Sequence, residues 1–520
     1  MIWRCPVLFL LVALCSSATD AISQPRLLSL GCSRDVVVTS MASVTQGVVV
    51  GGSWSSDQGP GGHGGQGGTD AFLACFDEQL QLRWVQFYGG VGNDRVEAVT
   101  ALQDGSSDVV VAMTMAANTA SITSYTIGTV TLGGRGNTDA VIARISSSGD
   151  VVWVRNDGGT SYEIPTHVVS RPDGSVVVSG FFGQRSRFGS TTVESPSLQC
   201  AYLQLLDASG NHQGLVISEI SSSRDRVSWI PLMTPDGQLA IVSSATAEYT
   251  IASASIPPPE ASSTRIVTLN NLDVDRVEER PGCEQWTWSS DGTYAGIGIT
   301  DVCDPRLHDQ LIMGFVQDPE QNPEPLLLGT AGKESALQHV YSSGDAIVLA
   351  GVTASSVVVA QGDRDVVLDA DAFIVQVDRQ GTYLHSLDVD GMNAAVGAVV
   401  GSAQHVVAGI TVDGSVTCRS ARDGVPATLD LQCPSTVLVS WQDGPTHIDE
   451  VSGSSPRWLE HLPIDVYTLQ GRYVSQVNAH TFDRLPVGMV LVLRQGHRVS
   501  LCYASSSEHI SFSVPPAATR

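Results

Sequence analysis

The sequence predicts an all-β fold: a seven-bladed β-propeller followed by a small C-terminal β-sandwich-like domain. Three observations lead to this expectation. An apolar strand segment recurs seven times, a tight turn before a Val-rich run recurs in step with it, and no helical periodicity separates the copies. The chain has 520 residues, of which 42% are hydrophobic and 51 are glycine, so it can supply a large core and many turns.

The first recurring segment is a short apolar strand that in its clearest copies begins with Asp-Ala-Phe. The copies begin near residues 71, 140, 201, 265, 311, 372 and 437, about 61 residues apart on average. They are Asp70–Phe76, Asp139–Ile145, Cys200–Leu206, Arg265–Leu269, Leu311–Val316, Asp371–Val377 and Thr436–Trp441. β-branched and aromatic residues are frequent in these segments, which favours strands.

The second recurring segment is a turn, most often Asp-Gly, that precedes a run rich in Val. The turns are Gln46-Gly47, Asp104-Gly105, Asp173-Gly174, Asp236-Gly237, Asp291-Gly292, Gly344-Asp345 and Gln404-His405. Asp-Gly between apolar runs is typical of a hairpin, because glycine accepts the positive φ that the turn needs. A third segment contains Trp and ends in Gly-Gly, as in Leu82–Gly90 and Val151–Gly159.

Together these segments give each unit about four short antiparallel strands. One such sheet cannot bury both of its faces, whereas sheets packed around an axis can. The predicted blades are 34–92, 93–160, 161–222, 223–282, 283–333, 334–392 and 393–451. Stacked β-sandwiches are the alternative, but they do not explain a sevenfold spacing.

The units that begin at Asp70 and Asp139 resemble the SBBP-type β-propeller repeats of exported bacterial proteins. Those repeats share an Asp-Ala-Phe-Val-Ala strand, a Trp strand bracketed by glycines, and a Gly-Asn-Val-Tyr-Val-like strand. The resemblance covers about residues 34–451 and is poor in the fourth and fifth units. It implies a propeller and export, and it implies no catalytic residue and no particular ligand.

Residues 452–520 break the repeat and form the predicted C-terminal domain. Ile464–Val474 and Leu485–Arg494 resemble the strands of the type A sorting domain found in type IX secretion substrates. Thr468 and Met489-Val490 depart from that pattern, and the chain extends past its usual end. The resemblance implies passage across a bacterial outer membrane, then release or cell-surface attachment. The alternative is an ordinary small β domain.

The N-terminus has the pattern of a signal peptide over residues 1–21. Arg4 precedes the apolar run Pro6–Leu14, which is too short to span a bilayer, and small residues follow. We therefore expect cleavage after Ala18 or Ala21, a secreted or cell-surface location, and no transmembrane segment in the mature chain.

Export also favours disulfides between cysteines that are close in sequence. The expected pairs are Cys283 with Cys303 and Cys418 with Cys433. The alternative is that these cysteines are small buried side chains without a partner.

Charge and spacing exclude several functions. The net charge is −25 and Lys333 is the only lysine, so nucleic-acid binding is not expected. No Cys or His has metal-ligand spacing, and the carboxylates of Asp363–Asp371 lack the Gly and Glu of a helix-flanked calcium loop. We therefore expect neither a metal nor a cofactor.

Polar residues stand at the entry to the first strand of several units, where the channel mouth of a propeller lies. The candidates for ligand binding are Asp94, Arg95, Glu163, His167, Asp225 and Arg226. Converging carboxylates and Arg side chains can hold a polar ligand. The alternative is that these residues pair between blades and cap turns.

These features favour a non-enzymatic, monomeric scaffold that binds an extracellular protein or glycan. The alternative is a hydrolase or lyase acting on an extracellular polysaccharide, with acidic residues at the channel mouth as acid and base. Two carboxylates that face each other across the funnel, one with a raised pKa, would favour the enzyme. The chain has no Ser nucleophile elbow and no His-Glu-x-x-His motif.

Overall fold

The computed structural model divides the chain into two compact units, one of Gln24–Gln442 and one that joins Met1–Ser23 to Asp443–Arg520. It describes residues 25–30, 36–55, 68–116, 124–195, 199–220, 227–234, 237–245, 247–258, 263–281, 285–298, 309–315, 326–332, 335–344, 346–361, 364–402, 405–420, 426–431, 435–442, 464–468, 473–477, 489–495, 498–504 and 510–512. The predicted signal peptide lies outside these residues.

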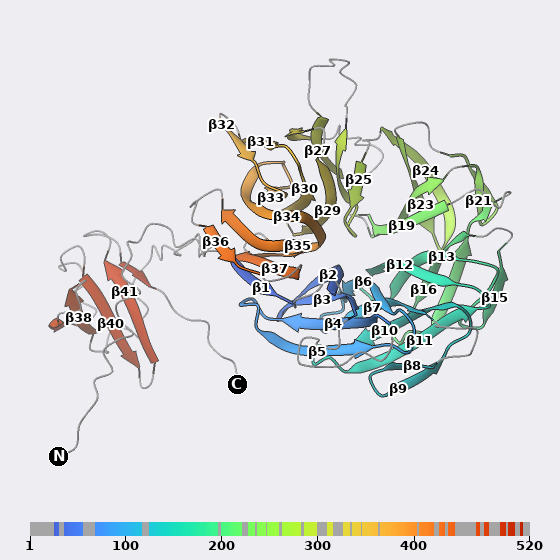
Figure 1. Ribbon diagram of the computed structural model, residues 1–520, viewed down its shortest axis with the longest axis horizontal. Helices are drawn as coiled ribbons and strands as arrows, with labels where there is room; N and C mark the ends of the chain where they lie inside the picture. The colour runs from blue at the N-terminus through green and yellow to red at the C-terminus, as the bar shows by residue number, and fades with distance from the viewer. Residues whose placement is uncertain are drawn as a thin grey trace. The chain divides into compact units, whose positions relative to one another are not determined.

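Every regular element described in Gln24–Gln442 is a β-strand, and the strands form successive antiparallel meanders around a common centre (Figure 1). The first meander is β2 Val36–Val44, β3 Gly47–Trp54, β4 Asp70–Phe76 and β5 Leu82–Tyr88, and the second is β6 Arg95–Ala101, β7 Val109–Ala116, β10 Thr138–Ile145 and β11 Val151–Gly159. The third is β12 Glu163–Ser170, β13 Val176–Phe182, β16 Cys200–Leu206 and β17 His212–Ile217, and the fourth is β19 Val227–Met233, β20 Leu239–Ala245, β23 Ser263–Asn270 and β24 Asp273–Pro281. The fifth is β25 Gln285–Trp288, β26 Thr293–Gly298, β27 Asp309–Phe315 and β28 Leu326–Ala331, and the sixth is β29 Ala336–Ser343, β30 Ala346–Val352, β33 Ala372–Asp378 and the first part of β34 Tyr383–Gly401.

The two middle strands of each meander are the apolar runs that the sequence repeats. All seven residues of β4 are buried, whereas β5, on the outside of the same meander, is largely half-buried or exposed. A strand reads as a continuous apolar run when both of its faces are packed. The middle strands therefore carry the contact between neighbouring meanders, as a propeller requires.

The seventh meander is completed by the beginning of the chain. It consists of the second part of β34, β35 His405–Ser420, β37 Ser435–Gln442 and β1 Arg26–Ser29, with β1 antiparallel to β37. The Thr436 hydroxyl also donates to the Val36 carbonyl at 2.6 Å, which ties this meander to the first. The all-β propeller fold is confirmed. The count of seven blades stays a prediction, because β34 joins the last two meanders in one eight-stranded sheet.

Short hairpins that the sequence did not predict cross between meanders. In each case the link between the second and third strands of one meander forms a hairpin beside the outer edge of the preceding meander. β14 Arg185–Phe188 and β15 Thr191–Glu194, for example, leave the third meander and pair with β11 of the second. The others are β8 Ser124–Ile127 with β9 Val130–Gly133, β21 Tyr249–Ile251 with β22 Ala254–Ile256 beside β18 Glu219–Ile220, and β31 Val357–Gln361 with β32 Arg364–Leu368 on β28. A similar link in the seventh meander is the end of β35 with β36 Pro426–Leu429, which lies along β34.

The unit that contains the C-terminal residues has one described sheet of five antiparallel strands. Its order is β39 Tyr473–Val477, β38 Ile464–Thr468, β40 Met489–Gln495, β41 Arg498–Ala504 and β42 Ile510–Phe512. β38 lies within, and β40 largely within, the two segments that carry the resemblance to a sorting domain. No helix in the described part of the chain is long and apolar enough to cross a membrane.

Candidate functional site

The predicted channel-mouth residues differ in exposure. Asp94 and Glu163 begin or precede the first strands of their meanders and are 0% exposed. Arg95 is exposed and pairs with Glu97 at 2.8 Å. His167 is half-buried in β12, 3.0 Å from the Thr166 hydroxyl, and burial lowers its pKa to about 4. Asp225 and Arg226 lie outside the described residues.

Asp94 is held by backbone amides at the joint between the first and second meanders. Its Oδ2 accepts the Gly90 N–H at 2.7 Å, and its Oδ1 accepts the Ala116 N–H at 2.9 Å. Burial raises its pKa to about 6, and the nearby Asp70 carboxylate adds to this shift. Both carboxyl oxygens are thus used to fix the chain where one meander passes to the next.

Glu163 has the equivalent role at the joint between the second and third meanders. Its Oε2 accepts the Gly159 N–H at 2.9 Å, and its Oε1 accepts a short hydrogen bond from the Ser186 hydroxyl. Burial raises its pKa to about 8, and the Asp139 carboxylate raises it further. A carboxyl group in this setting is protonated at neutral pH.

Asp139 and Asp157 complete this buried group of carboxyl side chains. Asp139 Oδ2 accepts the Arg135 N–H at 2.8 Å and lies 3.2 Å from the Tyr125 hydroxyl, which comes from the β8 hairpin. Asp157 accepts the Gly189 N–H at 2.8 Å and the Gln204 amide at 2.9 Å. Burial raises the pKa of both carboxyls. The group binds the backbone turns and side chains of two meanders together.

The Gly-Gly pair of the repeat makes room for these carboxyls. A Cβ at Gly158 would lie 2.0 Å from Asp139 Oδ1, and a Cβ at Gly89 would lie 2.6 Å from both Asp70 Oδ1 and Asp94 Oδ2. Glycine is the one residue that lets the backbone come so close to a carboxylate. The sequence shows the Gly-Gly pair, but its purpose becomes visible only in the structure.

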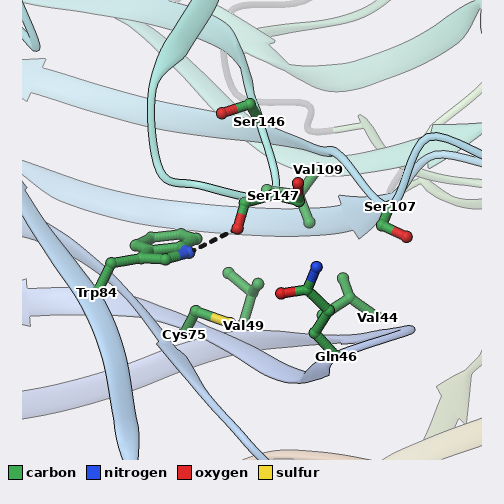
Figure 2. A pocket seen from close by; sticks show the side chains of 9 residues that line it. All are labelled: Val44, Gln46, Val49, Cys75, Trp84, Ser107, Val109, Ser146 and Ser147. Carbon is green, nitrogen blue, oxygen red and sulfur yellow. Dashed lines mark hydrogen bonds between the residues drawn. The ribbon is translucent and has the colours of Figure 1, made fainter. Parts of the chain in front are cut away.

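The Trp residues of the repeat also join neighbouring meanders. Trp84 Nε1 donates to the Ser147 carbonyl at 2.9 Å, and Trp153 Nε1 donates to the Ala208 carbonyl at 3.1 Å (Figure 2 shows the first). The cavity beside Trp84 has a volume of about 10 Å³, which is the space of about one water. Cys75 lines this cavity, and burial raises the pKa of its thiol to about 11, so it is not a reactive thiolate.

Gln338 and His339, in β29 of the sixth meander, bind the part of β34 that begins the seventh meander. The Val396 N–H donates to Gln338 Oε1 at 2.8 Å, and His339 Nε2 lies 3.0 Å from the Val396 carbonyl. Burial lowers the pKa of His339, which favours the neutral ring as donor to that carbonyl. These contacts, like those of Asp94 and Glu163, have the geometry of pairing between blades and capping of turns.

The predicted disulfide between Cys418 and Cys433 is wrong. Cys418 is a free, buried thiol, because β35 places it opposite Val389 and Ala427 within the apolar core of the last two meanders. Cys75 is likewise a free, buried thiol, and the buried Cys200 Sγ accepts a hydrogen bond from the Ser195 hydroxyl at 3.0 Å. Cys283, Cys303 and Cys433 lie outside the described residues, so the pairing of Cys283 with Cys303 stays a prediction.

One wider opening lies among the tight turns of the third and fourth meanders. This cleft has a volume of about 480 Å³ and is lined by turn residues and by the ends of β19, β20 and β23. The sequence marks two of its turns only as hairpins, and no motif predicts a cleft there. Among the described residues, no group of three or more His, Cys, Asp or Glu side chains is arranged to hold a metal ion.

Comparisons with known proteins give structural neighbours of low similarity. No protein-family model matches the chain, and no curated protein is similar to it in sequence. The β-propeller domain of the Trilobed protease from Pyrococcus furiosus is 8% identical with a TM-score of 0.39, over 78% of this chain and 98% of that one. A protein of unknown function from Dyadobacter fermentans is 7% identical with a TM-score of 0.35, over 81% of this chain and 100% of that one. A prolyl endopeptidase chain is 9% identical with a TM-score of 0.38, over 89% of this chain and 54% of that one. The fold assignment therefore rests on the strand pairing of this chain itself.

Proposed function

We propose that this protein is an exported scaffold that binds an extracellular protein or glycan and catalyses no reaction. The observation that carries the proposal is the use of the buried carboxyls. Asp94 and Glu163, which would be the acid and base of an enzyme, are 0% exposed and each accepts hydrogen bonds with both oxygens. Neither lines a described cavity that could hold a sugar.

The enzyme alternative draws on one specific observation, the pKa of Glu163, which is raised to about 8 as a catalytic acid requires. Burial against protein groups explains that shift without a substrate. The experiment that separates the two incubates the full chain with acidic and neutral polysaccharides and measures new reducing ends or unsaturated products. We expect none. Cleavage by the wild-type chain that is lost in Glu163→Gln would contradict the scaffold proposal and support the hydrolase or lyase alternative.

Export and the SBBP resemblance belong to the same proposal. The signal-peptide pattern predicts a mature chain that begins at Thr19 or Ile22, which N-terminal sequencing of the extracellular protein would show. We further propose that the C-terminal residues act as a type IX sorting domain. The antiparallel pairing of β38 with β40 supports this, because these strands carry the resemblance. Deletion of 443–520 should then keep the propeller inside the outer membrane.

A further inference from the structure

The cleft between the third and fourth meanders has the composition of a binding site. Three turns form its walls: Arg171–Asp173 after β12, Gly237-Gln238 before β20, and Asn270-Asn271 at the end of β23. Apolar side chains from the strand ends also line it, namely Met233, Leu239 and Leu269. Polar walls over an apolar lining are typical of sites that bind small ligands and peptides.

Among the polar side chains of the walls, the Asp173 carboxylate is already bonded to Ser175, whereas Arg171 is not paired with a described residue. The Arg171 Nε is buried and has no hydrogen-bond partner, and its guanidinium makes no ion pair within 4 Å of a described residue. The side-chain amides of Gln238, Asn270 and Asn271 make no hydrogen bond to any described residue. A guanidinium that lines the cleft and has no ion-pair partner among the described residues is able to bind a ligand carboxylate through its terminal N–H groups.

The walls are held in place before any ligand arrives. The Arg171 N–H donates to the Ser175 carbonyl at 2.9 Å, and the Gly174 N–H donates to the Arg171 carbonyl at 3.0 Å. On the facing turn, the Gln238 N–H donates to the Thr234 hydroxyl at 2.9 Å. Turns fixed in this way need little ordering on binding, which favours affinity.

We propose that this cleft binds a short segment of a protein partner in which one aliphatic side chain lies next to one carboxylate. The aliphatic group fits the surface of Met233, Leu239 and Leu269, and the carboxylate fits the bidentate fork of Arg171. The amides of Gln238 and Asn270 match the donors and acceptors of a peptide backbone. Among the described residues that line the cleft there is no aromatic ring on which a sugar could stack.

Asp173 and the overall charge limit the ligand to a single negative group. Asp173 Oδ1 accepts from the Ser175 N–H and hydroxyl at 2.9 and 2.6 Å, and these bonds lower the pKa of Asp173 and keep it charged. The whole chain has a net charge of −25, which opposes anions at a distance. Runs of acidic residues should therefore bind worse than one acidic residue beside a Leu.

The test uses saturation-transfer NMR on the full chain with three blocked hexapeptides. The probe is acetyl-Gly-Ser-Leu-Asp-Ser-Gly-amide, and its controls replace Asp by Asn or Leu by Ser. We expect the Leu methyl groups to receive saturation and each control peptide to bind at least about tenfold more weakly. Arg171→Gln should weaken the probe by a similar factor, and Asn271→Gly, which suits the φ of +47° at that position, should weaken it less.

The matched protein control is Arg83→Gln, which removes the same charge from the exposed strand β5 and should leave binding unchanged. No transfer to the probe, or equal transfer to wild type and Arg171→Gln, would overturn the proposal. Transfer to a neutral tetrasaccharide instead of the probe would overturn it as well, and would make the cleft a glycan site. The inference rests on the proposed scaffold function. The two are tested separately, because polysaccharide cleavage that depends on Glu163 would contradict the scaffold function, whereas the peptide experiment tests only the cleft.

Discussion

The joint between the first and second meanders and the joint between the fourth and fifth are built differently. Among the described residues, seventeen buried hydrophobic side chains fill the first joint, and the Asp94 carboxyl and Trp84 add hydrogen bonds across it. At the second joint, the described residues include a cluster of five buried hydrophobic side chains: Leu232, Ala240, Val242, Ile266 and Tyr294. A described backbone hydrogen bond across it runs from the Met233 N–H to the Ser290 carbonyl at 2.8 Å.

The sequence explains this difference. The outer strand of the fourth meander, Asp273–Pro281, contains neither the Trp nor the Gly-Gly pair that the first two meanders share. The residues that define the repeat are therefore the residues that join one meander to the next. In the described part of the joint between the fourth and fifth meanders, the contacts are apolar packing and the hydrogen bond from the Met233 N–H, and residues 282–284, which precede β25, lie outside the described residues.

The largest effect should come from filling the space that a joint carboxyl needs. Gly158→Ala places a Cβ 2.0 Å from Asp139 Oδ1, so the backbone or the buried carboxyl must move. We expect a loss of at least about 3 kcal/mol in the free energy of unfolding, measured by urea denaturation. Gly133→Ala is the control, because nothing lies within 4 Å of its Cβ, and it should change stability by less than about 0.5 kcal/mol. Equal effects would contradict the role given to the Gly-Gly pair.

A similar effect is expected from reduction of the predicted disulfide in the fifth unit. A bridge between Cys283 and Cys303 would close a loop whose loss costs about 3 kcal/mol. It would stabilise the region where the repeat pattern is weakest. Peptide mapping should find these two cysteines linked and Cys418 free, and reduction should lower the melting temperature. Free thiols at both positions would show that no disulfide between Cys283 and Cys303 stabilises this region.

The pH dependence of stability should report the buried carboxyl of Glu163 at the joint between the second and third meanders. The pKa of Glu163 is about 8 in the folded chain and 4.5 in the unfolded one, so folding is favoured while both states are protonated and stability falls as pH rises from 4.5 to about 8. The slope from this group is up to about 1.4 kcal/mol per pH unit. Asp94, with a pKa of about 6, acts in the same direction. Glu163→Gln should flatten the curve, and a variant as steep as wild type would show that Glu163 ionises freely.

The smallest effect should come from the Trp hydrogen bonds. Trp84→Phe keeps most of the ring but removes the donor to the Ser147 carbonyl, which should cost about 1 kcal/mol. Trp153→Phe should behave alike, because its donor reaches the equivalent Ala208 carbonyl. Arg83→Gln, on the same strand as Trp84 but exposed, is the control and should be neutral in thermal unfolding. If Trp84→Phe leaves the stability unchanged, the Trp rings contribute through packing and not through their hydrogen bonds.

Local patterns predict most of the strands and hairpins, because they are set by alternating turns and apolar runs within each unit. Ring closure by β1 was not predictable in this way, since Arg26–Ser29 pairs with residues more than 400 positions away and the repeat pattern begins only after it. The hairpins between meanders were missed because short segments such as Ser124–Ile127 look like loops until a neighbouring strand is present.

The sequence predicts where two of the candidate residues stand along the strands, but not what their side chains contact. The sequence places Asp94 and Glu163 at the entry to the first strands, and they lie there. Whether such a carboxyl faces a ligand or a backbone amide depends on burial, which periodicity does not encode. The cleft was not predictable, because Arg171 and Asn271 stand one hundred residues apart and meet only through the packing of two meanders.

Native-state hydrogen exchange tests the central claim most directly. The claim is that the residues of the repeat hold neighbouring meanders together. The amides of Gly90 and Gly159 donate to the buried carboxyls of Asp94 and Glu163, whereas the amide of Met233 spans the joint between the fourth and fifth meanders. The account predicts that Gly90 and Gly159 exchange only when the propeller unfolds globally and that Met233 exchanges earlier, through local opening. Faster exchange at Gly90 and Gly159 than at Met233 would contradict it.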